Sequence, residues 1–450
     1  MTTFAELGLP HSIIYSLNSQ GIHEAFPIQA AAIPDALSGK DILGRGPTGS
    51  GKTLGFGLPI IARLAQHGHS TPGQPRALVL VPTRELASQV QQRLSPIAHA
   101  EGLRIIEVVG GVAISKHIRQ FAAPIDILVA TPGRALDLIH NNHLDLSSIS
   151  ITAIDEADQM ADMGFLPQVQ KILRQTPPAS QRLLFSATLD GDVSSLIDEF
   201  LTDPVTHSTS TAEATVDTMK HYQFTIANKD ERTQVVLHIG ARNGQTIMFT
   251  RTKYAVDKWV RKLRRAGINA AGLHGNKGQT SRTAAIEAFT SGQVRVLVAT
   301  DIAARGIDIS TVDLVVHIDP PVEPKSYVHR AGRTARAGNT GSVVTLVLPE
   351  QLDAVTSVLT KAGVKQNMIH VHANSAELKR ITGARTPSGK TLGDFQPAAH
   401  TTTSEGPSKP QHQSAQTTTR PPRKKQQKKK KTWGGAVAVS KHGARKKRSR

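Results

Sequence analysis

The sequence contains no cysteine, no long apolar run and no group of histidines at metal-binding spacing. Without cysteine there can be no disulfide bonds or thiolate metal sites, and the scattered histidines lack the spacing of a zinc site. No apolar segment approaches the roughly 20 residues that a membrane-spanning helix needs. The first ten residues have neither a basic start nor a long apolar stretch. We therefore expect a cytoplasmic protein with no membrane partner.

Acidic residues are scarce in one part of the chain. The 450 residues carry a formal net charge of +19, yet residues 371–450 contain 19 Lys and Arg against 3 Asp and Glu. This segment is also rich in Thr, Ser, Gln and Pro, a composition that cannot bury enough apolar surface to fold alone. Its charge attracts polyanions through counterion release, and Trp433 could stack on a base. We expect a disordered polybasic tail that binds nucleic acid, with a solvated solubility tail as the alternative.

Short apolar runs rich in β-branched residues recur before this tail, between longer segments of mixed character. This alternation is typical of parallel sheets covered by helices. A segment without apolar periodicity at residues 207–217 separates two sets of runs and indicates a linker. We therefore predict an α/β protein with two parallel-sheet domains, at residues 1–206 and 218–370. The runs lie at residues 77–81, 125–130, 149–154 and 182–185, and at residues 246–249, 294–299, 314–318 and 342–348.

A phosphate-binding pattern, G-x-x-x-x-G-K-[ST], occurs once, as Gly46-Pro47-Thr48-Gly49-Ser50-Gly51-Lys52-Thr53. A glycine-rich turn points successive backbone N–H groups at phosphate oxygens, and the helix that begins there adds the positive end of its dipole. Lys52 would neutralise the β and γ phosphates, and Thr53 would offer its hydroxyl to Mg²⁺. The residues expected to surround the phosphates are Thr48, Gly49, Ser50 and Gly51.

An acidic pair, Asp155 and Glu156, directly follows the apolar run at residues 149–154. Ligands of open α/β sheets bind at the carboxyl ends of the strands, so Asp155 is placed to hold Mg²⁺, directly or through water. Glu156 is the candidate to orient and deprotonate the attacking water. Adjacent acids can also simply stabilise a helix N-terminus. The phosphate-binding pattern in the same chain favours nucleotide hydrolysis instead.

The second predicted domain contains three arginines within seven residues, Arg330, Arg333 and Arg336. A guanidinium binds phosphate in a bidentate manner and suits the role of an arginine finger in phosphoryl transfer. A basic surface patch is the alternative. If these arginines act on a nucleotide held by the first domain, hydrolysis requires both domains, and nucleic acid lying across both would stimulate it.

With these motifs in this order, the chain resembles the DEAD-box ATP-dependent RNA helicases of superfamily 2 over roughly residues 4–365. The resemblance implies two RecA-like domains that bind ATP, Mg²⁺ and RNA. It further implies RNA-stimulated ATP hydrolysis coupled to local unwinding of short RNA duplexes or to remodelling of RNA–protein complexes. The other matching motifs are PTREL at 82–86, Gly110-Gly111, TPGR at 131–134, DEAD at 155–158, SAT at 186–188, Gln279 with Arg282, ATDIAARGIDI at 299–309 and HRAGRTARAG at 329–338.

The resemblance also implies roles for individual positions. Phe4 and Gln29 would read adenine, Asp308 would meet the ribose, and Arg333 and Arg336 would be the arginine fingers. The residues expected to couple the domains are Asp158, Ser186, Thr188 and His329. The expected RNA contacts are Arg84, Gly111, Thr131, Arg134, Thr250, Gln279, Arg282 and Thr300. Contacts to phosphate and 2′-hydroxyl groups carry no base sequence, so we expect sequence-tolerant binding.

The chain departs from the family pattern in two places: residues 25–29 are AFPIQ instead of PTPIQ, and Gly46 replaces an Ala. Its basic extension resembles that of the bacterial RhlE-like members, whose usual settings are ribosome assembly, RNA decay and growth in the cold. Ribosomal precursors and RNA-decay proteins are therefore the expected partners. Two alternatives are a superfamily 2 enzyme acting on DNA and a non-enzymatic RNA-binding scaffold. The scaffold would have lost Lys52, Glu156 or an arginine finger, and all are present.

Overall fold

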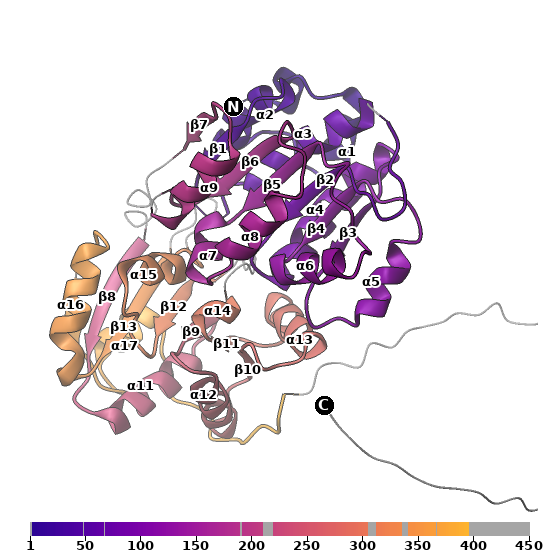
Figure 1. The fold of residues 1–450 in the computed structure, drawn as a ribbon. Helices are drawn as coiled ribbons and strands as arrows, with labels where there is room; N and C mark the ends of the chain where they lie inside the picture. Colours follow the sequence, from indigo (N-terminus) through magenta and orange to yellow (C-terminus); the bar gives the residue numbers. More distant parts are fainter. Residues whose placement is uncertain are drawn as a thin grey trace, which may run out of the picture. The chain divides into compact units, whose positions relative to one another are not determined.

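The computed structural model describes residues 2–47, 49–66, 68–189, 191–209, 219–304, 312–334, 341–365 and 367–395. Contacts divide the chain into residues 1–398 and 399–450, and every described residue belongs to the first of these units. This unit contains two sheets (Figure 1). We call residues 2–209 the first lobe and residues 219–395 the second lobe. No helix in the described part of the chain is both long and apolar enough to cross a bilayer.

The first lobe is built on a seven-stranded sheet with the order β3-β4-β2-β5-β6-β1-β7, in which all neighbours are parallel. Strand β2 is buried at every position because helices cover both faces of the sheet, which explains its continuous apolar run. The strands are β1 (Ile42–Arg45), β2 (Ala77–Leu80), β3 (Ile105–Val108), β4 (Ile127–Ala130), β5 (Ile151–Asp155), β6 (Gln181–Ser186) and β7 (Val205–Ser208).

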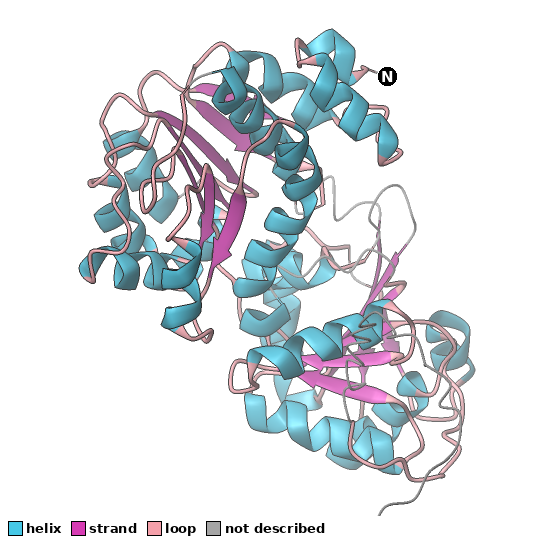
Figure 2. Ribbon diagram, turned by 90° about the vertical axis from the view of Figure 1, so that its right-hand side faces the viewer, coloured by secondary structure: helices cyan, strands magenta, loops and turns pink. Residues whose placement is uncertain are grey.

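Helices flank this sheet on both sides, as Figure 2 shows. They bury two apolar clusters, one containing Phe56 and Phe185 and the other containing Leu128 and Met160. The helices are η1 (Phe4–Leu7), α1 (His11–Ser19), α2 (Pro27–Leu37), α3 (Lys52–Gln66), α4 (Arg84–Ala100), α5 (Ile114–Gln120), α6 (Pro132–His140), α7 (Ala157–Asp162), α8 (Leu166–Leu173) and α9 (Asp192–Phe200).

The second lobe repeats this topology with the order β10-β11-β9-β12-β13-β8-β14, again with parallel neighbours throughout. Each strand takes the place of the strand seven numbers earlier, so the two lobes share one RecA-like architecture. The strands are β8 (Met219–Thr225), β9 (Thr246–Phe249), β10 (Ala270–Leu273), β11 (Val296–Ala299), β12 (Leu314–His317), β13 (Gly341–Val347) and β14 (Met368–His370). The helices are α11 (Lys229–Gly240), α12 (Lys253–Arg265), α13 (Gln279–Thr290), α14 (Asp301–Ala304), α15 (Pro324–Ala331), η2 (Pro349–Gln351), α16 (Leu352–Lys361) and α17 (Ala376–Thr382).

The fold class predicted from the sequence is confirmed, since each of the eight apolar runs contains or overlaps a strand. The boundary expected after residue 370 is wrong. Val371 and Leu378 are fully buried in the second core of this lobe, and α17 continues the fold. Residues 384–395 then pack along the lobe, so an extension can begin no earlier than residue 396. The linker expected from residue 207 starts too early, because His207 and Ser208 end strand β7. Residues 210–217 of the expected linker lie outside the described part.

Candidate active site

The phosphate-binding pattern forms the turn between β1 and α3, where a strand meets the N-terminus of a helix. Gly49 and Gly51 have φ values of +89° and +88°, which only glycine adopts without strain. A side chain at Gly51 would also overlap the Gln29 amide and the Phe26 ring. Lys52 begins α3 and is buried, and its Nζ donates to the carbonyl oxygen of Gly46 at 2.9 Å. The predicted strand–turn–helix context of the pattern is therefore present.

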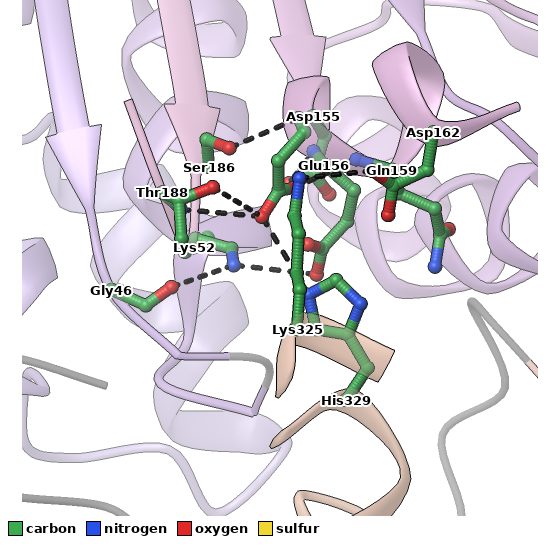
Figure 3. Close-up of polar contacts among 11 residues, drawn as sticks. Gly46, Lys52, Asp155, Glu156, Gln159, Asp162, Ser186, Thr188, Lys325 and His329 are labelled. Carbon is green, nitrogen blue, oxygen red and sulfur yellow. Dashed lines mark hydrogen bonds and ion pairs between the residues drawn. The ribbon is translucent and has the colours of Figure 1, made fainter. Parts of the chain in front are cut away.

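The acidic pair lies at the carboxyl end of β5 and faces this turn (Figure 3). Glu156 has φ +54° and ψ +51°, a left-handed conformation that costs free energy for a residue with a side chain. This backbone turn brings its Oε1 to 3.3 Å from the Lys52 Nζ, in a pair that is almost wholly buried. The Glu156 N–H donates to Asp155 Oδ1 at 3.0 Å. A strained backbone at this position is consistent with a functional constraint on where Glu156 points.

Burial controls the protonation of this group of charges. Burial and, to a lesser degree, the neighbouring charge of Glu156 together raise the pKa of Asp155 to about 7 against the opposing effect of Lys52. Burial alone would lower the pKa of Lys52, but the carboxylates of Glu156 and Asp155 outweigh it and raise that pKa. Lys52 is therefore a cation at neutral pH. Asp155 sits in a position where an added positive charge would favour its ionised form.

A cavity of about 560 Å³ opens beside these residues, and all its lining residues belong to the first lobe. Gly49, Gly51, Lys52, Thr53, Asp155 and Glu156 line it, as the phosphate-binding pattern predicts. The Ser50 hydroxyl is buried without a hydrogen-bond partner among the described residues. Thr48 lies outside the described part. The volume suits a ligand of nucleotide size.

Gln29 connects the far side of this cavity to the phosphate-binding turn. Its side chain accepts from the Phe26 N–H at 2.9 Å, and its Nε2 donates to the Gly51 carbonyl at 2.9 Å. Gln29 thus holds the turn while lining the cavity. Phe4, in contrast, is buried in the core at 2% exposure and does not line the cavity. Helix η1 directs the Phe4 ring inward, and the contact of Phe4 with adenine stays a prediction.

Nine residues that line the same cavity were not predicted as site residues, among them Ile22, Phe26, Gln89 and Arg93. Ile22 and Phe26 precede Gln29 by only a few residues, so proximity to Gln29 could have suggested them. Gln89 and Arg93 lie one turn apart on α4, which no motif connects with the nucleotide site. Only the packing of α4 beside α3 reveals them.

Asp158 is fully buried on α7, between the end of β6 and helix α15 of the second lobe. Its N–H donates to Ser186 Oγ at 3.1 Å, and its Oδ2 accepts from the Thr188 N–H and hydroxyl at 3.2 and 3.3 Å. His329 Nε2, from α15, lies 3.7 Å from the same Oδ2. The structure therefore brings together the four residues that the resemblance assigns to domain coupling.

The charge of Asp158 is stabilised despite its burial. Burial would raise the pKa of this carboxyl group, but the hydrogen bond and charge of His329 and the charges of Lys52 and Lys325 hold it well below its usual range. Lys325 also forms an ion pair with Asp162 on α7, with Nζ and Oδ1 3.0 Å apart. Helix α15 thus contacts α7 at two positions, through His329 to Asp158 and through Lys325 to Asp162.

The arginines of the second lobe do not share one role. Arg330 forms a bidentate pair with Asp301, with its Nη2 2.8 Å from Oδ2, and its Nη1 donates to the Asp319 carbonyl at 2.8 Å. Its guanidinium carbon also lies 5.2 Å from the centre of the Phe249 ring. These contacts are all within the second lobe, so Arg330 stabilises the fold of that lobe. Arg333 is buried beside His329 and Arg330. Arg336 and Asp308 lie outside the described residues.

A second cavity, of about 450 Å³, contains four of the expected RNA contacts: Arg84, Thr131, Arg134 and Arg282. Between the lobes, Glu85 Oε2 pairs with Arg282 Nη2 at 2.9 Å, and its Oε1 accepts from Gln279 Nε2 at 3.1 Å. Gln279 Oε1 accepts from Arg84 Nη1 at 3.5 Å. Gln279 and Arg282 therefore contact the first lobe, and Arg84, Arg134 and Arg282 line the open space.

The three other expected RNA contacts occupy strand ends or a tight turn. Gly111 has φ +77°, and a side chain there would overlap the Arg84 guanidinium. Thr250 and Thr300 directly follow the neighbouring strands β9 and β11, so they share one edge of the second sheet. Thr250 is fully buried, and its hydroxyl donates to Asp319 Oδ2 at 2.7 Å.

Comparison with known proteins agrees with this geometry. Residues 26–196 match the DEAD/DEAH box helicase family, and residues 228–338 match the helicase conserved C-terminal domain. The chain is 40% identical over 352 residues to the DEAD-box ATP-dependent RNA helicase CshA of Bacillus cereus, which covers 78% of this chain and 66% of that protein. It is 37% identical over 353 residues to the CshA of Geobacillus kaustophilus, covering 78% and 75%.

A solved structure, S. cerevisiae Dbp5 bound to RNA and ADP BeF3, has the same fold with a TM-score of 0.74. It is 26% identical and covers 85% of this chain and 98% of its own. The chain spans slightly less than two thirds of the B. cereus relative but three quarters of the G. kaustophilus one. From the two domain matches and these relatives we conclude that the chain belongs to the DEAD-box ATP-dependent RNA helicase family.

Proposed function

We propose that this protein hydrolyses ATP when RNA is bound and uses the cycle to separate short RNA duplexes or remodel RNA–protein complexes. The observation that carries the proposal is the buried pair of Lys52 and Glu156 beside a nucleotide-sized cavity, one residue from Asp155. The likeness to relatives named as RNA helicases supports RNA as the stimulating polymer.

In the proposed reaction, a water molecule attacks the γ phosphorus and the bond from that phosphorus to the β–γ bridging oxygen breaks. ADP and inorganic phosphate are the products. Glu156 accepts the proton of the attacking water. Lys52 donates to the β and γ phosphate oxygens and has to exchange its contact with Glu156 for them. That exchange frees Glu156 to bind water.

The donor atoms beside the cavity suit Mg²⁺. Thr53 offers a hydroxyl and Asp155 a carboxylate whose pKa is raised by burial and by the charge of Glu156. No group of three or more His, Asp or Glu side chains converges on a metal site in the part of the chain that is described. This fits Mg²⁺, which keeps several waters and uses one or two protein ligands with substrate phosphates. When bound, the ion would neutralise phosphate charge at Thr53 and Asp155.

RNA is proposed to stimulate hydrolysis by favouring the lobe contacts at Asp158 and His329, which link α15 to the nucleotide site. Arg333 and Arg336 are then proposed to stabilise charge on the γ-phosphoryl group. Arg84, Thr131 and Arg134 would hold the RNA backbone in the second cavity. Gln279 and Arg282 are proposed to act mainly by joining the lobes, because both contact Glu85.

The cellular setting is a further proposal. A basic extension resembles that of RhlE-like members, whereas the relatives quoted above carry the name CshA. Ribosome assembly and RNA decay are the proposed processes, with ribosomal precursors or RNA-decay proteins as partners. A cytoplasmic location stays a prediction.

The deciding experiment measures steady-state ATP hydrolysis with no polymer, with single-stranded RNA and with DNA of the same sequence. We expect RNA to raise the rate about tenfold or more, because hydrolysis needs both lobes together. Equal stimulation by DNA would favour the DNA-acting alternative. No hydrolysis under any condition would favour a scaffold.

A chain ending at residue 395 should keep its thermal midpoint but bind RNA more weakly and with a smaller salt dependence. The segment removed, residues 396–450, has 15 Lys and Arg against a single acid. The control is a chain ending at residue 370, which loses buried Val371 and Leu378 and should melt lower by several degrees. Fluorescence anisotropy across a salt series and thermal melting report the two effects. An unchanged affinity and salt slope for the 395 chain would show that the tail is no RNA anchor.

A further inference from the structure

Helix α12 of the second lobe carries a basic face with one exposed aromatic ring. Its apolar side packs into the lobe through Val256, Trp259 and Leu263. The opposite side presents Tyr254, Lys258, Arg261 and Arg265, which are spaced by four, three and four residues and so share one helix face. We call these four residues the basic stripe. Tyr254 is 75% exposed, so its ring is accessible to a ligand beside the three cations.

The cations of the stripe are not neutralised by the protein. Lys258, Arg261 and Arg265 form no ion pair or side-chain hydrogen bond with any residue that the structure describes. The one acid of α12, Asp257, instead pairs with His274, with Oδ1 and Nε2 3.1 Å apart.

Two of the other cations of α12 bond to polar groups of the lobe, and the third, Lys253, has its Nζ 5.3 Å from the centre of the Tyr254 ring. Arg264 donates to the Asn269 side chain at 2.8 Å, and Lys262 donates to the Thr233 hydroxyl at 3.2 Å. Lys262 and Arg264 thus contact other parts of the lobe, whereas the three cations of the basic stripe are exposed to solvent.

The stripe begins at the edge of the sheet where RNA is expected. Thr252 caps α12 two residues after Thr250, and Thr300 ends the neighbouring strand β11. From Tyr254 to Arg265 the helix rises about 16 Å, which is long enough to follow several nucleotides. A strand leaving the contacts at Thr250 and Thr300 would therefore reach Tyr254 first.

The other end of the stripe lies where the chain leaves the second lobe. Residues 384–395 run against the end of α12: the Gly389 N–H donates to the Ala266 carbonyl at 3.0 Å and the Leu392 N–H to the Arg264 carbonyl at 2.9 Å. The Thr391 hydroxyl donates to the Arg265 carbonyl at 3.1 Å. The 15 cations of residues 396–450 follow directly in the sequence.

We propose that the basic stripe is an auxiliary binding surface for single-stranded RNA that extends beyond the core site. Lys258, Arg261 and Arg265 contact successive phosphates, and Tyr254 stacks on an unpaired base. Single strands fit better than a duplex because bases must be free to stack on the tyrosine. The inference rests on the proposed function, since it assumes RNA at Thr250 and Thr300.

The test compares two RNAs on the full chain, one of about eight nucleotides, sized for the core, and one lengthened by about ten nucleotides at either end. The variant K258Q/R261Q/R265Q should bind the longer RNA about tenfold more weakly at moderate salt. Its plot of log Kd against log salt should become shallower by about 2, because each lost phosphate contact contributes about 0.7. Tyr254→Ala should weaken binding of the longer RNA at least about fivefold, and Tyr254→Phe should not. The short RNA should bind all variants within about twofold.

The matched control, K361Q/K379Q/R380Q, removes three exposed cations from α16 and α17 of the same lobe. It should leave both affinities within about twofold, which separates a local contact from a change in net charge. The proposal would be overturned if the two triple variants lost equal affinity, or if the stripe variant bound the longer RNA as tightly as wild type. An acidic protein would then be the candidate partner of the stripe. A wild-type chain that binds neither RNA would instead contradict the proposed function itself.

Discussion

Replacing Glu156 with Gln should lower the RNA-stimulated kcat of ATP hydrolysis by about 10² to 10⁴-fold while ATP still binds. The amide keeps the size of the side chain but cannot accept the proton of the attacking water. The left-handed backbone at Glu156 fixes its position beside Lys52, so no neighbouring carboxylate can simply take its place. Single-turnover hydrolysis with RNA measures the loss.

Affinity for ATP should stay within about threefold or become tighter in the same variant. The buried Lys52 ammonium now pairs with Glu156, and that contact competes with the phosphates. Removing the carboxylate charge removes the competition. A titration with a fluorescent ATP analogue checks this expectation, and a large loss of binding would mean that Glu156 has a structural role.

Glu199→Gln provides the matched control, because Glu199 lies on α9 in a partly exposed pair with Arg174. The same chemical change at that position should alter neither kcat nor ATP affinity measurably. If Glu156→Gln hydrolysed ATP at the wild-type rate, Glu156 could not be the general base.

The parts of the fold and site that follow from local chemistry could be predicted from the sequence. Buried parallel strands such as β2 and β11 consist of apolar residues throughout, so they stand out as runs. β8 was not recognised as a strand, because Lys220 and Gln223 interrupt its apolar residues. The phosphate-binding turn was recognised because Gly49 and Gly51 are required by backbone conformation.

The parts that depend on packing between distant segments could not be predicted. Phe4 has the residue type of a base-stacking group, yet the path of η1 buries it in the core. Gln279 and Arg282 look like RNA ligands by charge and polarity, but they contact Glu85 about 195 positions earlier in the chain. Arg330 resembles Arg333 in sequence, and only the pairing with Asp301 distinguishes its role. The end of the second lobe was misplaced because α17 is amphipathic and short, and polar residues surround it.

Replacing Asp158 with Asn should lower RNA-stimulated kcat about 10²-fold without preventing ATP binding. The carboxylate accepts from the Thr188 backbone and hydroxyl through Oδ2, and the same oxygen faces His329 of the second lobe. The amide of the Asp158→Asn variant can accept from the Thr188 N–H only through its oxygen. That oxygen carries no negative charge, so His329 loses its charged partner. Removing one partner of a buried charged contact leaves the other unpaired, which typically costs several kcal/mol.

A double-mutant cycle with His329→Ala tests whether this loss acts through the lobe contact. If Asp158 works mainly by engaging His329, the double variant should be no slower than either single one, and the coupling should be about 2 to 3 kcal/mol, equivalent to about 10² in rate. Additive losses would instead mean that the Asp158 carboxylate acts within the first lobe, by holding Thr188. Asp162→Asn, which removes the neighbouring ion pair with Lys325, should cost less than about fivefold because that pair is partly exposed. Asp158 and Asp162 lie four residues apart on α7, so comparing their variants distinguishes two kinds of contact. We expect the Asp158 contact to couple RNA binding to the nucleotide site, and the Asp162 contact only to add attraction between the lobes.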